Sequence, residues 1–125
     1  MHSEYIRRIS WEEVNDYLNI IAGQLDSHNY SGVYGVPRGG LVLAAWLSHK
    51  LYLPLLFEPS EKCIVIDDIC DSGDGLINTL YYYGIKPKNS CFITSMFKGE
   101  HATVDYLDYC HDIKKDNWIA FPWEQ

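Results

Sequence analysis

The chain has 125 residues, 47% of them hydrophobic and 22% charged, which is a globular composition and excludes a disordered protein. Ten Lys and Arg residues against seventeen Asp and Glu give a net charge of −7. This charge argues against a general nucleic-acid-binding or anionic-membrane surface, although it allows one small phosphorylated ligand. The length predicts a single domain over 1–125. Because we find neither a membrane-spanning apolar run nor a signal peptide, we expect a cytoplasmic protein.

Helix and strand signals alternate along the first half of the chain. Ser10 and Glu13 have the spacing of a capping box, and apolar residues three to four apart then predict a helix from Trp11 to Leu25. The elements expected after it are a short buried strand over 32–36, an apolar helix over 41–51, an edge strand over 53–57 and a central parallel strand over 63–66.

The second half continues the alternation. Its expected elements are an Asp- and Gly-rich loop over 67–75, a helix over 76–83, strands over 90–97 and 104–109, and an aromatic tail over 118–123. Such alternation predicts an α/β fold with right-handed crossovers and a mostly parallel sheet. Ligands of such sheets bind at the carboxyl ends of the strands, where both Gly-rich loops of this chain fall.

Four cysteines are present without a CxxC pair. Cys63, Cys70 and Cys91 lie within or beside apolar runs, and the fourth is Cys110. We therefore expect the first three to be buried, reduced thiols rather than zinc ligands or disulfides.

The segment from Ile64 to Gly75 carries the strongest functional signal. A buried strand leads to Asp67 and Asp68, Asp71 follows, and a Ser-Gly-Asp-Gly turn then opens a helix. The backbone N–H groups and serine hydroxyl of such a turn suit a phosphate, and paired carboxylates suit a cis-diol or a divalent cation. Together they fit a ribose 5-phosphate. A solvated acidic loop and a calcium loop stay open as alternatives, although the spacing is not that of an EF-hand.

This segment resembles the 5-phosphoribosyl pyrophosphate (PRPP) motif of the type I phosphoribosyltransferases, in which a hydrophobic strand, two acids and two further residues precede Asp-Ser/Thr-Gly. Two further stretches resemble the bacterial xanthine–guanine (6-oxopurine) branch. Residues 35–41, GVPRGGL, resemble its pyrophosphate loop, and residues 118–124, WIAFPWE, resemble its purine-binding tail. The resemblance covers nearly the whole chain. It implies a mostly parallel twisted sheet flanked by helices, a short C-terminal purine-binding hood and a truncated flexible loop.

The resemblance also implies roles for the residues that match these motifs. Asp67 and Asp68 would bind the ribose hydroxyls, with Asp68 next to Mg²⁺, and Asp71 would be the catalytic residue at N7 of the purine. The family often has a non-proline cis peptide in its pyrophosphate loop. The other implied roles are pyrophosphate binding by Arg38 and Gly39, 5′-phosphate binding by Ser72, Gly73, Asp74 and Gly75, and purine binding by Lys98, Trp118 and Ile119.

The chain departs from that family at two places. Type I enzymes usually carry a long mobile loop that covers PRPP, whereas only Glu58 to Lys62 connects the corresponding strands here. Gly75 also stands where the family commonly has a hydroxyl residue, and Asp74 places a carboxylate beside the expected phosphate. Both departures concern how PRPP is held and shielded from water.

We therefore predict a Mg²⁺-dependent purine phosphoribosyltransferase that joins guanine, xanthine or hypoxanthine to PRPP and releases a nucleoside 5′-monophosphate and pyrophosphate. The expected partners are these small molecules, without nucleic acid, and the resemblance implies a homodimer or homotetramer. The short 58–62 connection leaves open a regulatory homologue that binds PRPP or a nucleotide with little or no turnover. An enzyme acting on an unusual base is a further alternative.

Overall fold

The computed structural model describes residues 5–86, 91–99, 111–112 and 117–124. At its centre lies a five-stranded parallel sheet with the strand order β3-β2-β4-β5-β6. Its strands are β2 (Val33–Gly35), β3 (Leu55–Leu56), β4 (Ile64–Cys70), β5 (Phe92–Lys98) and β6 (His111–Asp112). The predicted α/β class with a parallel sheet is therefore confirmed.

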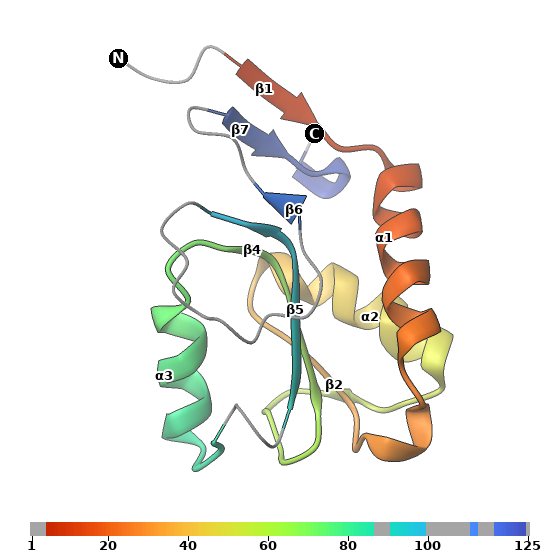
Figure 1. The fold of residues 1–125 in the computed structure, drawn as a ribbon, viewed down its shortest axis with the longest axis vertical. Coiled ribbons are helices and arrows are strands. Elements are labelled where there is room, and N and C mark those ends of the chain that lie inside the picture. Colours follow the sequence, from red (N-terminus) through yellow and green to blue (C-terminus); the bar gives the residue numbers. More distant parts are fainter. Residues whose placement is uncertain (1–4, 87–90, 100–110, 113–116, 125) are drawn as a thin grey trace.

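Helices cover both faces of this sheet (Figure 1). α1 (Trp11–Gln24) and α2 (Gly39–Leu51) lie on one face, and α3 (Asp74–Tyr82) lies on the other. Two short 3₁₀ helices, η1 (Ser27–Asn29) and η2 (Pro122–Glu124), complete the helical elements of the described ranges. Among these helices we find none with both the length and the apolar character that a bilayer crossing requires.

The first helix forms as the local sequence predicts. The Ser10 hydroxyl accepts a hydrogen bond from the Glu13 N–H at 3.1 Å, and the Glu13 carboxylate accepts one from the Ser10 N–H at 3.3 Å. This capping box satisfies two N–H groups that would otherwise have no partner at the helix start. The helical spacing then buries one apolar face, made of Val14, Tyr17, Leu18 and Ile21.

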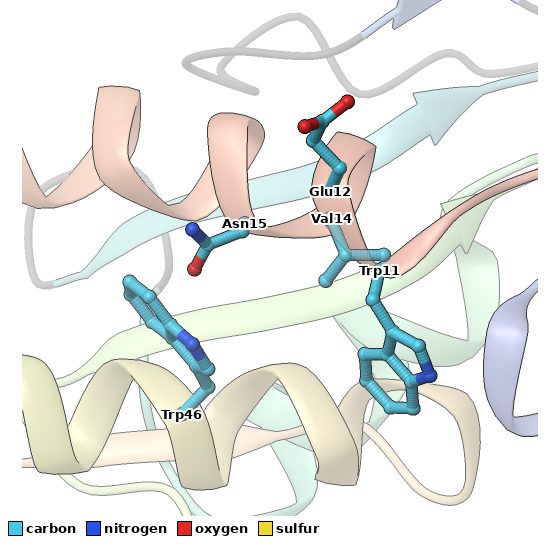
Figure 2. Close-up of a pocket in the computed structure, with 5 residues that line it drawn as sticks. All are labelled: Trp11, Glu12, Val14, Asn15 and Trp46. Carbon is cyan, nitrogen blue, oxygen red and sulfur yellow. The ribbon is translucent and has the colours of Figure 1, made fainter.

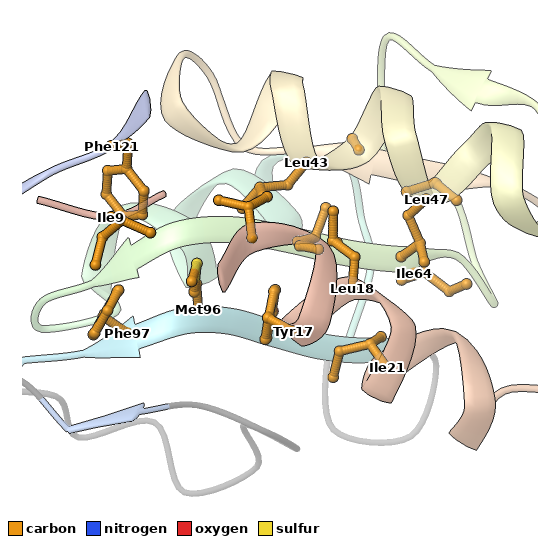
Figure 3. Close-up of a cluster of buried hydrophobic side chains, with 14 of the residues drawn as sticks. Ile9, Tyr17, Leu18, Ile21, Leu43, Leu47, Ile64, Met96, Phe97 and Phe121 are labelled. Atoms are coloured by element: carbon orange, nitrogen blue, oxygen red, sulfur yellow. The ribbon is translucent and has the colours of Figure 1, made fainter. Parts of the chain in front are cut away.

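The core consists of two clusters on opposite faces of the sheet, because successive strand residues point to opposite sides. Ile64 and Ile66 of β4 belong to the larger cluster, which α1 and α2 cover with residues such as Leu18 and Leu43 (Figure 3). Cys63 and Val65 belong to the smaller cluster with Leu76 and Leu80 of α3. Truncating one of these buried Leu or Ile side chains to alanine costs about 2–5 kcal/mol.

Two predicted boundaries near the candidate site were wrong. The central strand does not end at Ile66 but continues to Cys70, and α3 begins at Asp74 rather than at Leu76. The strand is longer because β5 keeps pairing with it, from Ile64 opposite Phe92 to Cys70 opposite Lys98. Asp67 and Asp68 thus lie within a paired strand. The strand expected over 104–109 lies outside the described residues.

The remaining boundaries differ from the predictions by a few residues. The helix expected over 41–51 begins at Gly39, and the edge strand expected over 53–57 is reduced to Leu55–Leu56, paired only with β2. Cys63, Cys70 and Cys91 are reduced thiols as predicted, although Cys91 is only partly buried.

A second, two-stranded sheet joins residues from both ends of the chain. β1 (Tyr5–Arg8) and β7 (Asn117–Ala120) pair in parallel, with Ile6 opposite Trp118 and Arg7 opposite Ile119. The sequence patterns did not predict β1. The expected C-terminal hood is therefore a ribbon to which the N-terminal segment contributes one of two strands, and Figure 1 shows this ribbon beyond one end of the central sheet.

The short connection before β4 is tied down at the amino end of the sheet. Ser31, which precedes β2, donates its N–H to the Lys62 carbonyl at 2.9 Å, and its hydroxyl lies 2.9 Å from the hydroxyl of Ser60. Because parallel strands share one direction, this connection lies at the end opposite to the Gly-rich loops. It therefore does not reach over them.

Candidate functional site

Most of the predicted site residues lie at one edge of the central sheet, where β2, β4 and β5 end. The loop with Arg38 and Gly39 follows β2, the loop with Asp71 follows β4, and Lys98 is the last residue of β5. The carboxyl ends of parallel strands are where α/β proteins bind ligands. The predicted clustering of these residues is thus found in the structure.

The loop after β2 packs directly against β4. The peptide bond between Pro37 and Arg38 is cis, as the resemblance led us to expect. A β-carbon on Gly39 would collide with the Asp68 carboxylate, and one on Gly40 would collide with the carbonyl oxygen of Ile66. Gly40 therefore has no room for a side chain, whereas a side chain on Gly39 would displace the Asp68 carboxylate. The exposed Arg38 directly precedes this contact.

The two adjacent acids are half-buried at the end of the sheet. A side-chain oxygen of Asp67 accepts the N–H of Asp68 at 2.8 Å, and one of Asp68 accepts the N–H of Ile69 at 2.7 Å. Burial, and next the hydrogen bond and charge of Asp68, raise the pKa of Asp67 to about 8. At neutral pH the unliganded pair therefore favours retaining a proton, which a bound cation would displace.

Asp71 lies beside the end of the neighbouring strand. The Gly99 N–H donates to the carbonyl oxygen of Cys70 at 2.8 Å, so the chain leaving β5 runs along the start of the Asp71 loop. A β-carbon on Gly99 would lie 2.8 Å from a side-chain oxygen of Asp71. Lys98, half-buried, is paired with Cys70 one residue before Asp71. The predicted catalytic acid and the predicted purine-binding lysine thus lie on adjacent segments.

The turn after Asp71 forms the N-terminus of α3. Gly73 has φ 93°, a left-handed conformation that glycine adopts without steric cost, and the Ser72 hydroxyl accepts the Asp74 N–H at 3.2 Å. The next N–H groups have no acceptor within the helix, because its first intrahelical bond is donated by Ile77. A β-carbon on Gly75 would meet nothing within 4 Å. The turn is therefore open at the place where N–H groups can receive an anion.

The donor set at this edge fits Mg²⁺. Carboxylate oxygens are its preferred protein ligands, and Mg²⁺ usually takes only one or two of them, together with water and substrate phosphates. Asp67 and Asp68 supply such a pair within the sheet. In the described ranges we find no group of three or more His, Cys, Asp or Glu residues suited to a metal ion. A metal held by this pair would complete its coordination with water and with oxygens of a bound phosphorylated substrate.

The tail residues predicted to bind the purine lie on β7. Ile119 is 7% exposed and its side chain belongs to the core, so only its backbone is available to a ligand. The backbone of Trp118 is opposite Ile6, whereas its ring lies outside the described part of the structure. Its expected stacking on the base stays a prediction. Sequence reasoning missed Gly99, for which a glycine directly after the strand-end lysine was the available signal.

A pocket of about 430 Å³ lies elsewhere, between α1 and α2 (Figure 2). It is lined by Trp11, Glu12, Val14, Asn15 and Trp46. Trp11 was expected on the buried face of its helix, but it is 58% exposed and its ring lies 5.9 Å from that of Trp123. Because this pocket contains none of the predicted site residues, we place the candidate site at the carboxyl edge of the sheet.

Comparison with known proteins gives matches over nearly the whole chain. No protein-family model matches it. The xanthine-guanine phosphoribosyltransferase of Idiomarina loihiensis is 29% identical over 150 residues, and the match covers 98% of this chain and 89% of that protein. The enzyme of the same name from Vibrio parahaemolyticus is 26% identical over 139 residues, covering 93% of this chain and 87% of that protein.

Solved structures show the same fold. A purine phosphoribosyltransferase from Pyrococcus horikoshii superposes with a TM-score of 0.76 at 24% identity, covering 96% of this chain and 94% of that one. The xanthine-guanine-hypoxanthine phosphoribosyltransferase of Helicobacter pylori gives a TM-score of 0.76 at 21% identity, with the same coverage. The chain therefore has the fold of these phosphoribosyltransferases, and over nearly its whole length its sequence is similar to the bacterial xanthine-guanine enzymes.

Proposed function

We propose that this chain is a purine phosphoribosyltransferase that transfers the phosphoribosyl group of PRPP to a 6-oxopurine. The observation that carries the proposal is the convergence of three strand ends. Gly39 after β2 packs against Asp68 of β4, and Gly99 after β5 packs against Asp71. These contacts bring together the segments that contain Arg38, the acid pair, Asp71 and Lys98, and this supports the proposal.

PRPP would lie across the first loop and the acid pair. Its pyrophosphate would meet the backbone of Gly39 and the guanidinium of Arg38, which is exposed to receive it. The ribose hydroxyls would donate to Asp67 and Asp68, and Asp68 would hold Mg²⁺ directly or through water. When bound, this ion would offset the negative charge of the departing pyrophosphate.

The 5′-phosphate would bind at the N-terminus of α3. The N–H groups after Gly73 and the Ser72 hydroxyl would donate to the phosphate oxygens, as in other helix N-terminal phosphate sites. Asp74 is exposed, so its carboxylate has room to turn toward solvent. Gly75 supplies an N–H but no hydroxyl, which leaves this loop one donor short of the usual family pattern.

In the reaction a nitrogen of the purine forms a bond to C1 of the ribose while the C1–oxygen bond to pyrophosphate breaks. Asp71 would accept the proton from N7 as this bond forms, and Lys98 would donate to the exocyclic O6 of a 6-oxopurine. Both residues lie beside Cys70 and Gly99 at the junction of β4 and β5. The remaining rate acceleration would come from positioning the two substrates and from stabilising the charge that develops in the transition state.

The test is steady-state nucleoside monophosphate formation from PRPP and Mg²⁺, with guanine, xanthine, hypoxanthine and adenine in parallel. We expect turnover with at least one 6-oxopurine and little with adenine. Asp71→Asn should lower kcat by about 100-fold or more, because it removes the proton acceptor. Asp16→Asn is the matched control, since it makes the same change at an exposed position of α1; its rate should equal that of the parent.

Binding and turnover together distinguish the enzyme from the regulatory homologue. Absence of turnover with every base, together with tight calorimetric binding of PRPP or GMP, would sink the enzyme proposal and support a regulatory nucleotide-binding protein. Turnover with adenine alone would contradict the assigned role of Lys98.

A further inference from the structure

Two thiols face each other at the amino ends of β4 and β5, far from the candidate site. The sulfur atoms of Cys63 and Cys91 are 3.8 Å apart. Each residue immediately precedes its strand, and the strands pair with Ile64 opposite Phe92. One step back along this register, the two cysteines are opposite each other.

The backbone geometry suits a bond between these sulfurs. Paired strands lie about 4.8 Å apart, within the range of about 4.4–6.8 Å that disulfides span between Cα atoms. Strand alternation also points both side chains to the same face, where Cys63 belongs to the α3-side cluster and Cys91 packs against it. The Phe92 N–H, which donates to the Cys63 carbonyl at 3.2 Å, fixes the two segments side by side.

We propose that Cys63 and Cys91 form a redox modification site, at which a hydroperoxide converts the two thiols into a reversible disulfide. The inference is independent of the proposed transferase activity. It concerns the end of the sheet opposite to the PRPP-binding residues and uses no residue of that site.

The local chemistry favours this reaction. Cys63 is fully buried, whereas Cys91 is partly exposed and gives a small oxidant access to the pair. The hydrogen bond from Cys91 lowers the pKa of the Cys63 thiol, while the same bond and burial raise the pKa of Cys91. The shared hydrogen bond thus makes Cys63 the member of the pair that gives up its proton more readily, and the thiolate is the form in which cysteine attacks.

The reaction balances with one peroxide per pair. One sulfur attacks a peroxide oxygen, the O–O bond breaks, and the leaving group departs with that thiol's proton as water or an alcohol. The resulting sulfenic acid is attacked by the second sulfur, its S–O bond breaks, and the hydroxide leaves as water with the second proton. The two sulfurs lose two electrons in total, and the peroxide gains them.

The disulfide would close the chain segment between the two strands, which includes the Asp67–Gly75 region and α3. A crosslink that closes such a loop restricts the unfolded chain more than the folded one. Because the sulfurs are already neighbours, the folded state needs little rearrangement. Oxidation should therefore raise Tm by roughly 5–10 °C, and a reductant should reverse the rise.

The test is titration of the full chain with hydrogen peroxide, followed by peptide mass mapping and thiol counting under denaturing conditions. We expect one disulfide between Cys63 and Cys91, the loss of two titratable thiols and the predicted rise in Tm, all reversed by dithiothreitol. Cys91→Ala should abolish all three effects. Cys70→Ala is the matched control, because it removes another buried thiol but should leave them intact.

Three results would overturn the proposal: unchanged thiol counts at peroxide levels that oxidise free cysteine, a bond that joins a different pair or two chains, or a linked protein with an unchanged or lower Tm. Cys63→Ala, at a fully buried position, should behave as Cys91→Ala does. Should that variant fold poorly, the partly exposed Cys91 position still decides the question.

Discussion

The loop between β2 and α2 is flanked by Gly35, Gly39 and Gly40, and other atoms of the protein fill the space that a β-carbon on any of the three would need. In contrast, a β-carbon on Gly75, in the first turn of α3, meets nothing within 4 Å. The packed loop is held by close contacts of Gly39 with Asp68 and of Gly40 with the backbone of β4. The open loop, at the start of α3, depends on the left-handed backbone of Gly73. Neighbouring residues therefore hold the packed loop in place, whereas the open loop has free space beside it.

Breaking the packed loop should have the largest effect. Gly39→Ala drives a methyl group into the Asp68 carboxylate, which must then move away from the position where it would hold ribose and metal. We expect kcat/KM for PRPP to fall about 100-fold, the scale of a catalytic group misplaced by about 1 Å. Steady-state kinetics with varied PRPP at saturating base measure this fall in kcat/KM.

Gly23→Ala serves as the control for that change. Gly23 lies in α1, and a β-carbon there meets nothing within 4 Å, so this variant should keep parental kinetics and gain about 0.5–1 kcal/mol of stability. Equal kinetics for Gly39→Ala and the parent would contradict the close fit between the first loop and the acid pair.

A second experiment tests the acid pair, Asp67 and Asp68, against which the packed loop lies. The pKa of Asp67 is raised from 3.8 to about 8, so between these values the folded state holds a proton that the unfolded chain has released. Stability of the ligand-free protein should therefore fall as pH rises from about 4 to 8. Asp67→Asn should flatten this dependence and be more stable than the parent above pH 8, by on the order of 1–3 kcal/mol.

Urea denaturation at pH 5 and pH 8.5 measures this difference. Asp16→Asn, at an exposed position, should keep the parental pH dependence. Parallel stability curves for Asp67→Asn and the parent would show that Asp67 titrates normally and is not affected by its burial beside Asp68.

The smallest effect is expected in the open loop. Gly75→Ser restores a hydroxyl at the N-terminus of α3 without a clash, and should lower KM for PRPP several-fold by adding a phosphate donor. Gly75→Ala is the control, because it adds a β-carbon without the hydroxyl and so shows the effect of changing the backbone propensity alone. It should gain about 0.5–1 kcal/mol of stability from helix propensity and leave KM unchanged. A KM for Gly75→Ser no lower than that for Gly75→Ala would place the phosphate elsewhere.

Features that depend on neighbouring residues in the sequence were predictable. The capping box of Ser10 and Glu13, the turn at Gly73 and the short 58–62 connection each follow from a few consecutive residues. The clustering of the two Gly-rich loops followed as well, because parallel strands bring their carboxyl ends to one edge.

Features that depend on distant pairing were missed or misplaced. The extension of β4 through Asp67 to Cys70 requires β5 as a partner, and no local pattern places two acids inside a strand. The contact of Gly99 with Asp71 depends on the same pairing. β1 is a strand because β7 lies beside it, so its short sequence alone could not identify it.

The pairing of β1 with β7 sets an order of events during synthesis. Tyr5 to Arg8 are synthesised before the strands of the central sheet, but their partners, Asn117 to Ala120, are added only after β2, β4 and β5 have been made. The central sheet can therefore assemble while the N-terminal strand still lacks its partner, and closing so long a loop is entropically costly. The β1–β7 ribbon, proposed to hold the purine, is thus completed after the strands of the central sheet have been made, and a nascent chain can form the loops proposed to bind PRPP before this ribbon exists.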